Sequence, residues 1–198
     1  MGDLVRSFRS SMVTSCLLGV PLGHNYSFLQ GPTFSHPFIR EAMWCDRTNS
    51  STEKGKDIKD PRVLTDVGDI PIQEMQDCGI NDEILMKVIG DYVKCVMQEF
   101  PLRPLVLGSD HSISYPIVRV VSEKLGGQVD ILHIDAHPDI YDRFEGNCYS
   151  HACSFARFMD GGLCKTTSAD GIGRGYPSQN NKERVVVRSC SCKCSGRH

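Results

Sequence analysis

The chain has 198 residues, a charged fraction of 23% and a formal net charge of -2 at pH 7. A chain of this length can bury the core of one domain, and at most two domains are expected. Because the net charge is small, neither nucleic acid nor a membrane surface is expected as a partner. No apolar stretch of the sequence is long enough to span a bilayer.

The first half of the chain predicts two strands, two helices and a polar loop. Apolar runs predict strands at residues 15–21 and 62–67. A helix over residues 33–43 has apolar residues three to four apart, so it should bury one face, made of Phe38, Ile39, Ala42 and Met43. Residues 48–60 are polar and charged, which favours a surface loop. A long helical stripe follows over residues 81–100.

The second half predicts strands at residues 105–107 and 129–134, with a helix over residues 113–125 between them. Ser112 is the expected N-cap of that helix, and a further helix is predicted over residues 152–159. Strands that alternate with helices in this way indicate an α/β fold with a mostly parallel sheet.

Ten cysteines are present, and seven of them are scattered, mostly among apolar residues. Scattered cysteines of this kind are typical of reduced thiols in a core. The last three, Cys190, Cys192 and Cys194, occupy alternate positions near the C-terminus. Their spacing is not the paired pattern of zinc sites, so a metal-binding tail is the weakest of the functional hypotheses.

The stretch Val129–Asp139, VDILHIDAHPD, has the strongest functional pattern in the sequence. A strand-like apolar run leads into Asp135, His137 and Asp139, which stand at every second position. Since an extended backbone sends alternate side chains to one face, these three project together. Two carboxylates and an imidazole suit a divalent metal such as Mn²⁺. The alternative interpretation is a solvated turn rich in Asp and His.

His111 directly follows the preceding predicted strand, within Gly108–Ser112. Ligands of open α/β sheets bind beyond the carboxyl ends of the strands, so His111 is expected beside the Asp135 cluster. By itself, His111 is better interpreted as a helix N-terminal residue bonded to backbone. With the cluster it completes a set of four donors, in which two carboxylates could also bridge a metal pair.

A second group of polar residues follows the cluster. Gly146 and Asn147 mark a turn, and Ser150 and His151 precede the last predicted helix. A histidine beside a metal centre can shuttle protons or act as a general acid. A surface or capping histidine is an equal alternative for His151.

Several segments together resemble the ureohydrolase family, which comprises the arginases and agmatinases. They read LGSDHS, DILHIDAHPDIYD and CYSHACSFAR, and the earlier GVPLGHNYSFLQGP, IREAMW and LTDVGDIP resemble the plant arginase branch. The resemblance covers about Leu17 to Gly162. It implies a three-layer α/β/α domain with a mostly parallel sheet, a binuclear Mn²⁺ centre, and trimers or hexamers. The implied reaction is hydrolysis of L-arginine to L-ornithine and urea, or of agmatine to putrescine and urea.

The resemblance also implies a role for each motif residue. His111 and Asp139 would serve one metal, His137 would serve the other, and Asp135 would bridge them and take part in catalysis. His151 would be the catalytic proton shuttle that helps the amine leave. The substrate end would be lined by Gly146, Asn147 and Ser150.

Two departures from the family pattern bear on function. Tyr141 stands where animal arginases place a polar residue that contacts the α-amino acid end of the substrate, so the choice between L-arginine and agmatine stays open. The second metal motif of the family, Asp-x-Asp, does not occur after Asp139. The alternative to an active hydrolase is therefore a catalytically inactive product that binds a metal or intact subunits.

The sequence predicts three segments. Residues 1–14 should be disordered, and residues 15–162 should form a partial ureohydrolase domain that is incomplete at its C-terminal end. Residues 163–198 have little periodicity and read as an aberrant, disordered tail in a shifted reading frame. The strand at residues 129–134 should then keep an unpaired edge. The resembled family is mitochondrial, but no clear transit peptide is recognised, which predicts a cytoplasmic location.

Overall fold

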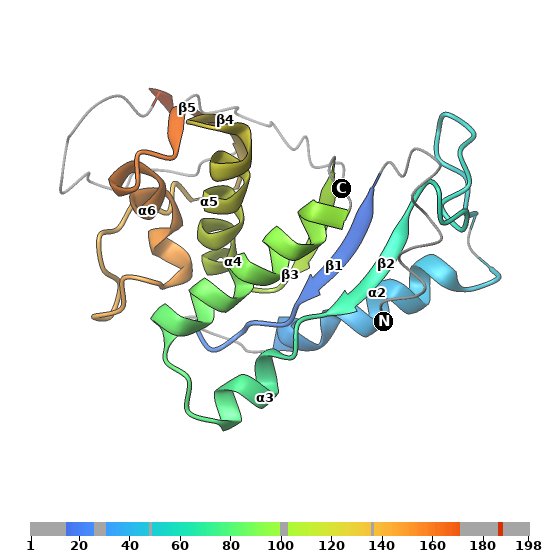
Figure 1. The fold of residues 1–198 in the computed structure, drawn as a ribbon, viewed down its shortest axis with the longest axis horizontal. Coiled ribbons are helices and arrows are strands. Elements are labelled where there is room, and N and C mark those ends of the chain that lie inside the picture. Colours follow the sequence, from blue (N-terminus) through green and yellow to red (C-terminus); the bar gives the residue numbers. More distant parts are fainter. Residues whose placement is uncertain are drawn as a thin grey trace, which may run out of the picture. The chain divides into compact units, whose positions relative to one another are not determined.

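The computed structural model describes residues 15–25, 31–47, 49–99, 103–135, 137–170 and 186–187 (Figure 1). The chain divides into two compact units, residues 1–113 and residues 114–198. The predictions for residues 1–14 and for Cys190, Cys192 and Cys194 concern residues outside the described ranges. None of the helices in the described part of the chain is long and apolar enough to cross a membrane.

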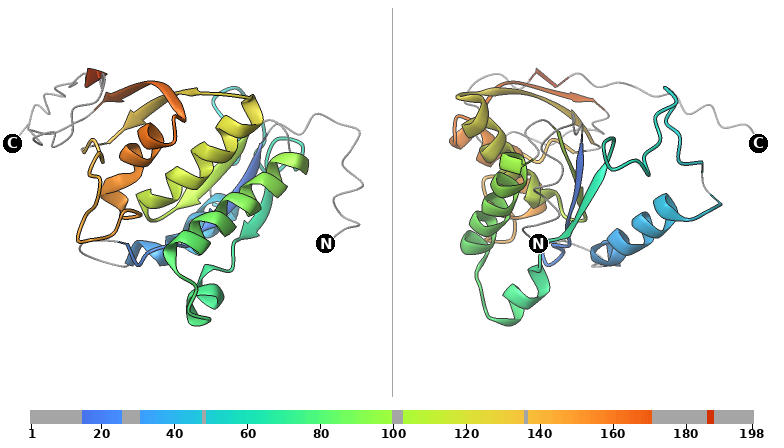
Figure 2. Two further views of the ribbon diagram at one scale, coloured as in Figure 1. Left: turned by 60° about the vertical axis from the view of Figure 1, so that its left-hand side comes forward. Right: turned by 45° about the vertical axis from the view of Figure 1, so that its right-hand side comes forward.

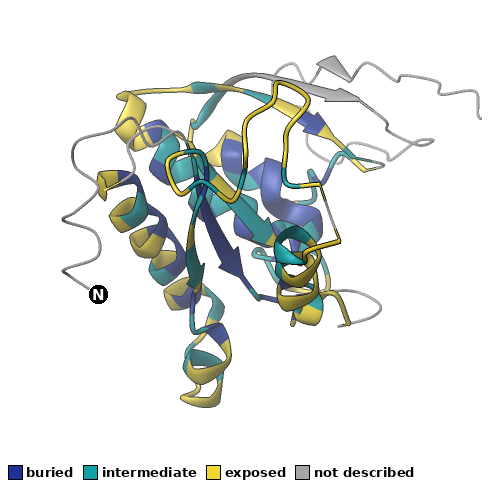
Figure 3. Cartoon of the chain, turned by 90° about the vertical axis from the view of Figure 1, so that its right-hand side faces the viewer, coloured by how far each residue is buried: buried dark blue, intermediate teal, exposed yellow. Residues whose placement is uncertain are grey.

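The first unit contains a parallel sheet of three strands in the order β2-β1-β3. Its strands are β1 (Cys16–Val20), β2 (Thr65–Asp69) and β3 (Pro104–Gly108). All five residues of the central β1 are buried (Figure 3), which follows from its uninterrupted apolar sequence CLLGV. The strands predicted at residues 15–21, 62–67 and 105–107 are therefore confirmed, with shifted ends.

Two longer helices lie on opposite faces of this sheet, α2 (Ser35–Trp44) and α4 (Asp82–Glu99) (Figure 2). The short η1 (Gly31–Phe34) leads into α2, and α3 (Ile72–Asp77) was not predicted from the sequence. The predicted helix is confirmed, but its buried face is shifted from the predicted stripe, since Ile84 and Tyr92 of that stripe are exposed. The buried apolar side chains are Leu85, Met86, Ile89, Val93 and Met97. The helix begins after Asn81, whose Oδ1 accepts a hydrogen bond of 3.0 Å from the N–H of Ile84.

The predicted buried face of α2 is wrong. Phe38, Ile39 and Ala42 are exposed, and His36 is the buried residue of this helix. Nε2 of His36 lies 2.8 Å from the carbonyl oxygen of Leu107 on β3. Arg40 donates to the carboxylates of Asp66 and Asp69 and to the carbonyl of Gly68 on β2. Polar contacts therefore attach α2 to the sheet, which a search for apolar spacing does not detect.

The second unit contains another parallel sheet, in the order β4-β5-β6. Its strands are β4 (Val129–Ile134), β5 (Cys164–Asp170) and β6 (Val186–Val187). The helices α5 (Ser114–Leu125) and α6 (Ser154–Asp160) pack against each other on one face of β4 and β5 (Figure 1). The turn η3 (His151–Cys153) leads into α6, and η2 (His111–Ile113) runs directly into α5.

The start of α5 differs from the prediction. Ser112 was expected to cap this helix, but the carboxylate Oδ1 of the buried Asp110 accepts the N–H of Ser112 at 2.9 Å. Asp110, two residues after the end of β3, therefore starts the turn that leads into α5, as Asp commonly does in an Asx-type turn.

The burial of β4 also differs from the sequence prediction. Its apolar run was expected to be buried, yet Leu132 and Ile134 are 66% and 78% exposed, while His133 is only 7% exposed. Strand β5 pairs along one edge of β4 from Val129 to Ile134, whereas the other edge of β4 has no partner strand among the described residues. Strand β5 lies within the range 163–198, of which residues 171–185 and 188–198 lie outside the described residues.

Candidate metal centre

The end of β4 places two potential metal ligands on one face. His133 is the fifth residue of the strand and Asp135 directly follows its last residue. Because the side-chain period of a strand is two, both point to the same side. Oδ1 of Asp135 accepts the N–H of His137 at 3.0 Å, so this carboxylate also shapes the turn by which the chain leaves the strand.

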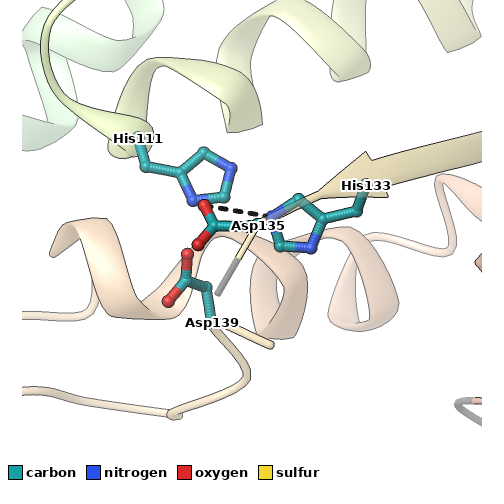
Figure 4. A group of neighbouring side chains, drawn as sticks. All are labelled: His111, His133, Asp135 and Asp139. Carbon is teal, nitrogen blue, oxygen red and sulfur yellow. Dashed lines mark ion pairs between the residues drawn. The ribbon is translucent and has the colours of Figure 1, made fainter. Parts of the chain in front are cut away.

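Four potential ligands gather at this point, His111, His133, Asp135 and Asp139 (Figure 4). Each offers one nitrogen or oxygen atom, and these four atoms all lie within 4.8 Å of one another. Carboxylate oxygens with imidazole nitrogens are a donor set that suits Mn²⁺, Fe²⁺ or Zn²⁺. The spacing allows a single cation to reach every member of this group, which we call the donor group.

Asp139 enters the donor group through an unusual backbone conformation. Its φ is 47°, in the left-handed region that few residues other than Gly adopt. Its carbonyl oxygen accepts the N–H of Phe155, in the first turn of α6, at 3.0 Å. The side chain is buried although it is an acid. A strained, buried carboxylate that is held by a neighbouring helix is typical of a functional position.

His133 was missed as a candidate ligand, because in the sequence it only interrupts an apolar run. Its ring stacks on that of Phe155, with centroids 4.2 Å apart and planes at 28°. Its Nε2 lies 3.5 Å from Oδ2 of Asp135. The signal was present, since His133 extends the alternation of Asp135 and His137 by one more step.

The structure brings three of the four predicted metal ligands together. His111, Asp135 and Asp139 belong to the donor group, whereas His137 does not. The side chain of His137 is 59% exposed, and its Nδ1 lies 3.7 Å from Oδ1 of Asp135. His137 is thus next to the group on its outer side, and its role as a ligand stays a prediction.

The residues predicted to line the substrate end share one loop. Phe144 and Asn147 exchange two backbone hydrogen bonds of 3.0 Å across a tight turn. The two residues between them, Glu145 and Gly146, have φ values of 51° and 81°, as a type I′ turn requires. Oδ1 of Asn147 accepts the N–H of Tyr149 at 2.8 Å, so its side chain supports the loop.

The predicted proton shuttle closes this loop. Ser150 is buried, and its Oγ lies 3.2 Å from Nδ1 of His151. The ring of His151 also meets Phe144 edge to face, with centroids 5.6 Å apart. These two contacts fix the orientation of the imidazole, as a group that moves a proton in a defined direction requires.

Helix α6 holds the loop through Arg157. Its Nη2 donates to Asp142 at 2.5 Å and lies 2.9 Å from Asp160. Burial alone would lower the pKa of Arg157, but the two neighbouring carboxylates outweigh it, and the net effect is a raised pKa. The guanidinium therefore stays charged. Burial raises the pKa of the neighbouring Cys153 thiol, which argues against this cysteine as a nucleophile.

Comparison with known proteins identifies the family of the chain. The model of the arginase family matches residues 13–195. The chain belongs to the arginase family. It is 67% identical to a mitochondrial arginase 1 of Oryza sativa over 195 residues, which are 96% of this chain and 57% of the relative. A mitochondrial agmatinase of Gallus gallus is 35% identical over 163 residues, 80% of this chain and 43% of that relative.

A solved structure agrees with this assignment to the arginase family. The arginase from Medicago truncatula superposes with a TM-score of 0.80 at 61% identity, over 87% of this chain and 54% of that chain. The predicted α/β fold of the arginase type is therefore confirmed. The chain spans a little more than half the length of these plant relatives. The family depends on a metal, and the donor group provides residues that can hold one.

Proposed function

We propose that the chain supplies ligands of a manganese centre that hydrolyses a guanidino group. The proposed reaction converts L-arginine and water into L-ornithine and urea. The observation that carries the proposal is the donor group, whose atoms converge within 4.8 Å in a chain of the arginase family. The proposed ligands are His111, Asp135, His137 and Asp139. His137 is included by the family pattern and by its position 3.7 Å from Asp135.

The roles of the other residues follow from their positions. When bound, Mn²⁺ would supply a Lewis acid that makes water nucleophilic near neutral pH. Asp135 would hold that water and its proton as the water adds to the guanidinium carbon. His151, oriented by Ser150, would then give a proton to the amine nitrogen as the C–N bond breaks. Gly146 and Asn147 would line the substrate end.

L-arginine is the proposed substrate, ahead of agmatine. The relatives named as arginases are about twice as similar to this chain as the agmatinase, at 67% against 35% identity. Agmatine lacks the α-carboxylate of arginine, so the two substrates differ in one charged group. Agmatinase activity is the alternative that the sequence leaves open, because Tyr141 stands where animal arginases place a polar residue that contacts the α-amino acid end of the substrate.

A second candidate is a chain that binds metal with little turnover. It is favoured by the absence of any Asp-x-Asp after Asp139 in the 198 residues. Fewer carboxylates leave the charge of a metal pair under-compensated, so a second ion should bind weakly. We therefore expect these 198 residues, assayed by themselves, to release urea at a small fraction of the rate of the Medicago arginase.

Urea release by the purified chain tests these proposals. The chain, its Asp135→Asn variant and the Medicago arginase are supplied with Mn²⁺ and either L-arginine or agmatine. We expect slow, Mn²⁺-dependent urea release from L-arginine, abolished in the variant. Faster release from agmatine would overturn L-arginine as the proposed substrate. A rate equal to that of the Medicago enzyme would show that an Asp-x-Asp pair after Asp139 is not needed. Equal background rates in the chain and the variant would overturn the hydrolase proposal, and metal binding would be the remaining candidate.

Assembly and location are further proposals. From the family pattern we propose a homo-oligomer, a trimer or a hexamer, which light scattering of the purified chain would identify.

The names of the plant relatives carry the words mitochondrial or chloroplastic. The cytoplasmic location stays a prediction, and microscopy of the tagged chain would contradict it if the signal coincided with either organelle.

A further inference from the structure

The buried ring of His133 is held in one orientation from two sides. Strand β4 carries it on its inner face, where it is 7% exposed. Phe155 of α6 stacks on it at a centroid distance of 4.2 Å. A buried aromatic ring that stacks on a second one has little freedom to rotate, because neighbouring atoms fill the space it would sweep. Its Nε2 therefore stays directed at Oδ2 of Asp135, 3.5 Å away.

Phe155 connects both acids of the donor group. Its ring stacks on His133, which faces Asp135, and its backbone N–H donates to the carbonyl of Asp139 at 3.0 Å. One residue of α6 thus supports both carboxylates, one through the side chain and one through the backbone. This arrangement is a support behind the ligands, which is how side chains that orient ligands are usually placed.

We propose that His133 is a positioning residue that holds the carboxylate of Asp135 in the orientation needed for metal binding, with Phe155 locking its ring. The inference rests on the proposed function, since it concerns the metal held by Asp135. Although His133 belongs to the donor group, in this role it would act through Asp135 and would not bind the metal itself. Its nitrogen faces the carboxylate oxygen that would otherwise rotate away, so its removal should weaken metal binding more than it weakens the fold.

Three variants separate this role from a merely structural one. His133→Phe keeps a ring that can stack on Phe155 but removes the nitrogen, whereas His133→Gln keeps a polar N–H near the carboxylate. The matched control is His36→Phe, which replaces another buried histidine whose Nε2 meets a backbone oxygen of β3. The control should lower the melting temperature and leave Mn²⁺ affinity unchanged.

Mn²⁺ affinity is measured by following the EPR signal of the free ion. We expect His133→Phe to weaken binding by about 10–100-fold, the usual effect of losing a group that orients a ligand, and His133→Gln to restore most of it. Unchanged affinity in His133→Phe would overturn the proposal. So would a pulsed-EPR spectrum in which this variant loses one coordinated imidazole nitrogen, because His133 would then be a direct ligand.

A measurement on the metal-free chain keeps the inference separate from the proposed function. The ring ¹⁵N shifts of His133 should change when Asp135 is replaced by Asn, but not when the exposed Asp142 is. If the wild-type chain took up no Mn²⁺, the proposed function would fail, and these shifts would still decide whether His133 and Asp135 are coupled. Ring shifts that ignore Asp135→Asn would overturn the inference.

Discussion

At the scale of single residues, Asp139 combines a backbone constraint with a chemical one. Its φ of 47° places it in the left-handed region, and the N–H of Phe155 holds its carbonyl there. Such conformations cost about 1–2 kcal/mol for most L-residues, and Asp and Asn adopt them more readily than others. The residue type therefore serves both the turn and the carboxylate that enters the donor group.

Replacing Asp139 in two ways separates these requirements. Asp139→Asn keeps a side chain that tolerates the turn but removes the charge, so Mn²⁺ affinity should fall while stability stays within about 0.5 kcal/mol of the wild type. Asp139→Ala should lose the affinity and about 1 kcal/mol of stability as well. Urea denaturation and metal titration of both variants would check this. Equal stability of the two variants would show that the backbone constraint is unimportant.

Cys16 gives a residue-scale prediction for the fold. Burial in the central strand β1 raises the pKa of its thiol from 9.0 to about 11, because the thiolate would lose its hydration. The neutral thiol favours the folded state, so its contribution is complete below pH 9 and is lost as the pH rises towards 11. The free energy of unfolding should therefore decline across this window.

Cys16→Ala is the variant that tests this titration. It should be less stable at neutral pH, because it removes a buried atom, but should lack the part of the decline between pH 9 and 11 that Cys16 causes. Chemical denaturation at several pH values measures both effects. The exposed Cys78→Ala serves as the control and should keep the wild-type pH dependence. An identical slope in the wild type and Cys16→Ala would contradict the assignment.

At the scale of elements, α6 organises the loop that carries the predicted substrate residues. Arg157 binds Asp142 of the loop and Asp160 of its own helix. Asp142 is 66% exposed, so this ion pair should contribute less than about 1 kcal/mol to stability. Its larger effect should be local, because it joins the start of the loop to the helix that follows it.

Replacing Arg157 should therefore loosen the loop without unfolding the chain. In Arg157→Met we expect faster hydrogen exchange of backbone amides between residues 141 and 149, with a small change in melting temperature. Arg62→Met is a matched control, since Arg62 pairs with Asp60 in an exposed loop of the first unit. The control should leave exchange at residues 141–149 unchanged. Equal exchange in the wild type and Arg157→Met would show that the backbone alone shapes this loop.

The elements also show what the sequence could and could not predict. Apolar runs and turn residues located β1, β3, β4 and α4, although only the run of β1 is buried along its whole length. They misjudged α2, which is attached by His36 and Arg40 through polar contacts. They also misjudged the inner face of β4, where His133 is buried and two apolar neighbours are exposed. Polar burial depends on partners distant in sequence, which periodicity does not contain.

At the scale of the whole molecule, the sequence predicted the candidate site more completely than it predicted the arrangement of the strands. Alternation of Asp135, His137 and Asp139 indicated a metal site, and three of the four predicted ligands do converge. His133 was missed because the same alternation was not followed back into the strand. The sequence predicted a single sheet, whereas two three-stranded parallel sheets are present among the described residues. Strand order depends on long-range pairing, and β5 had no apolar signal.

The most direct test of a metal centre built on Asp135 and Asp139 is Mn²⁺ binding by this chain. Equilibrium dialysis would compare the wild type with the double variant Asp135→Asn/Asp139→Asn, and with Asp142→Asn as the control for an acid outside the donor group. The wild type and the control should each retain at least one Mn²⁺ per chain, and the double variant should retain none. Equal Mn²⁺ binding by the double variant and the wild type would contradict the account.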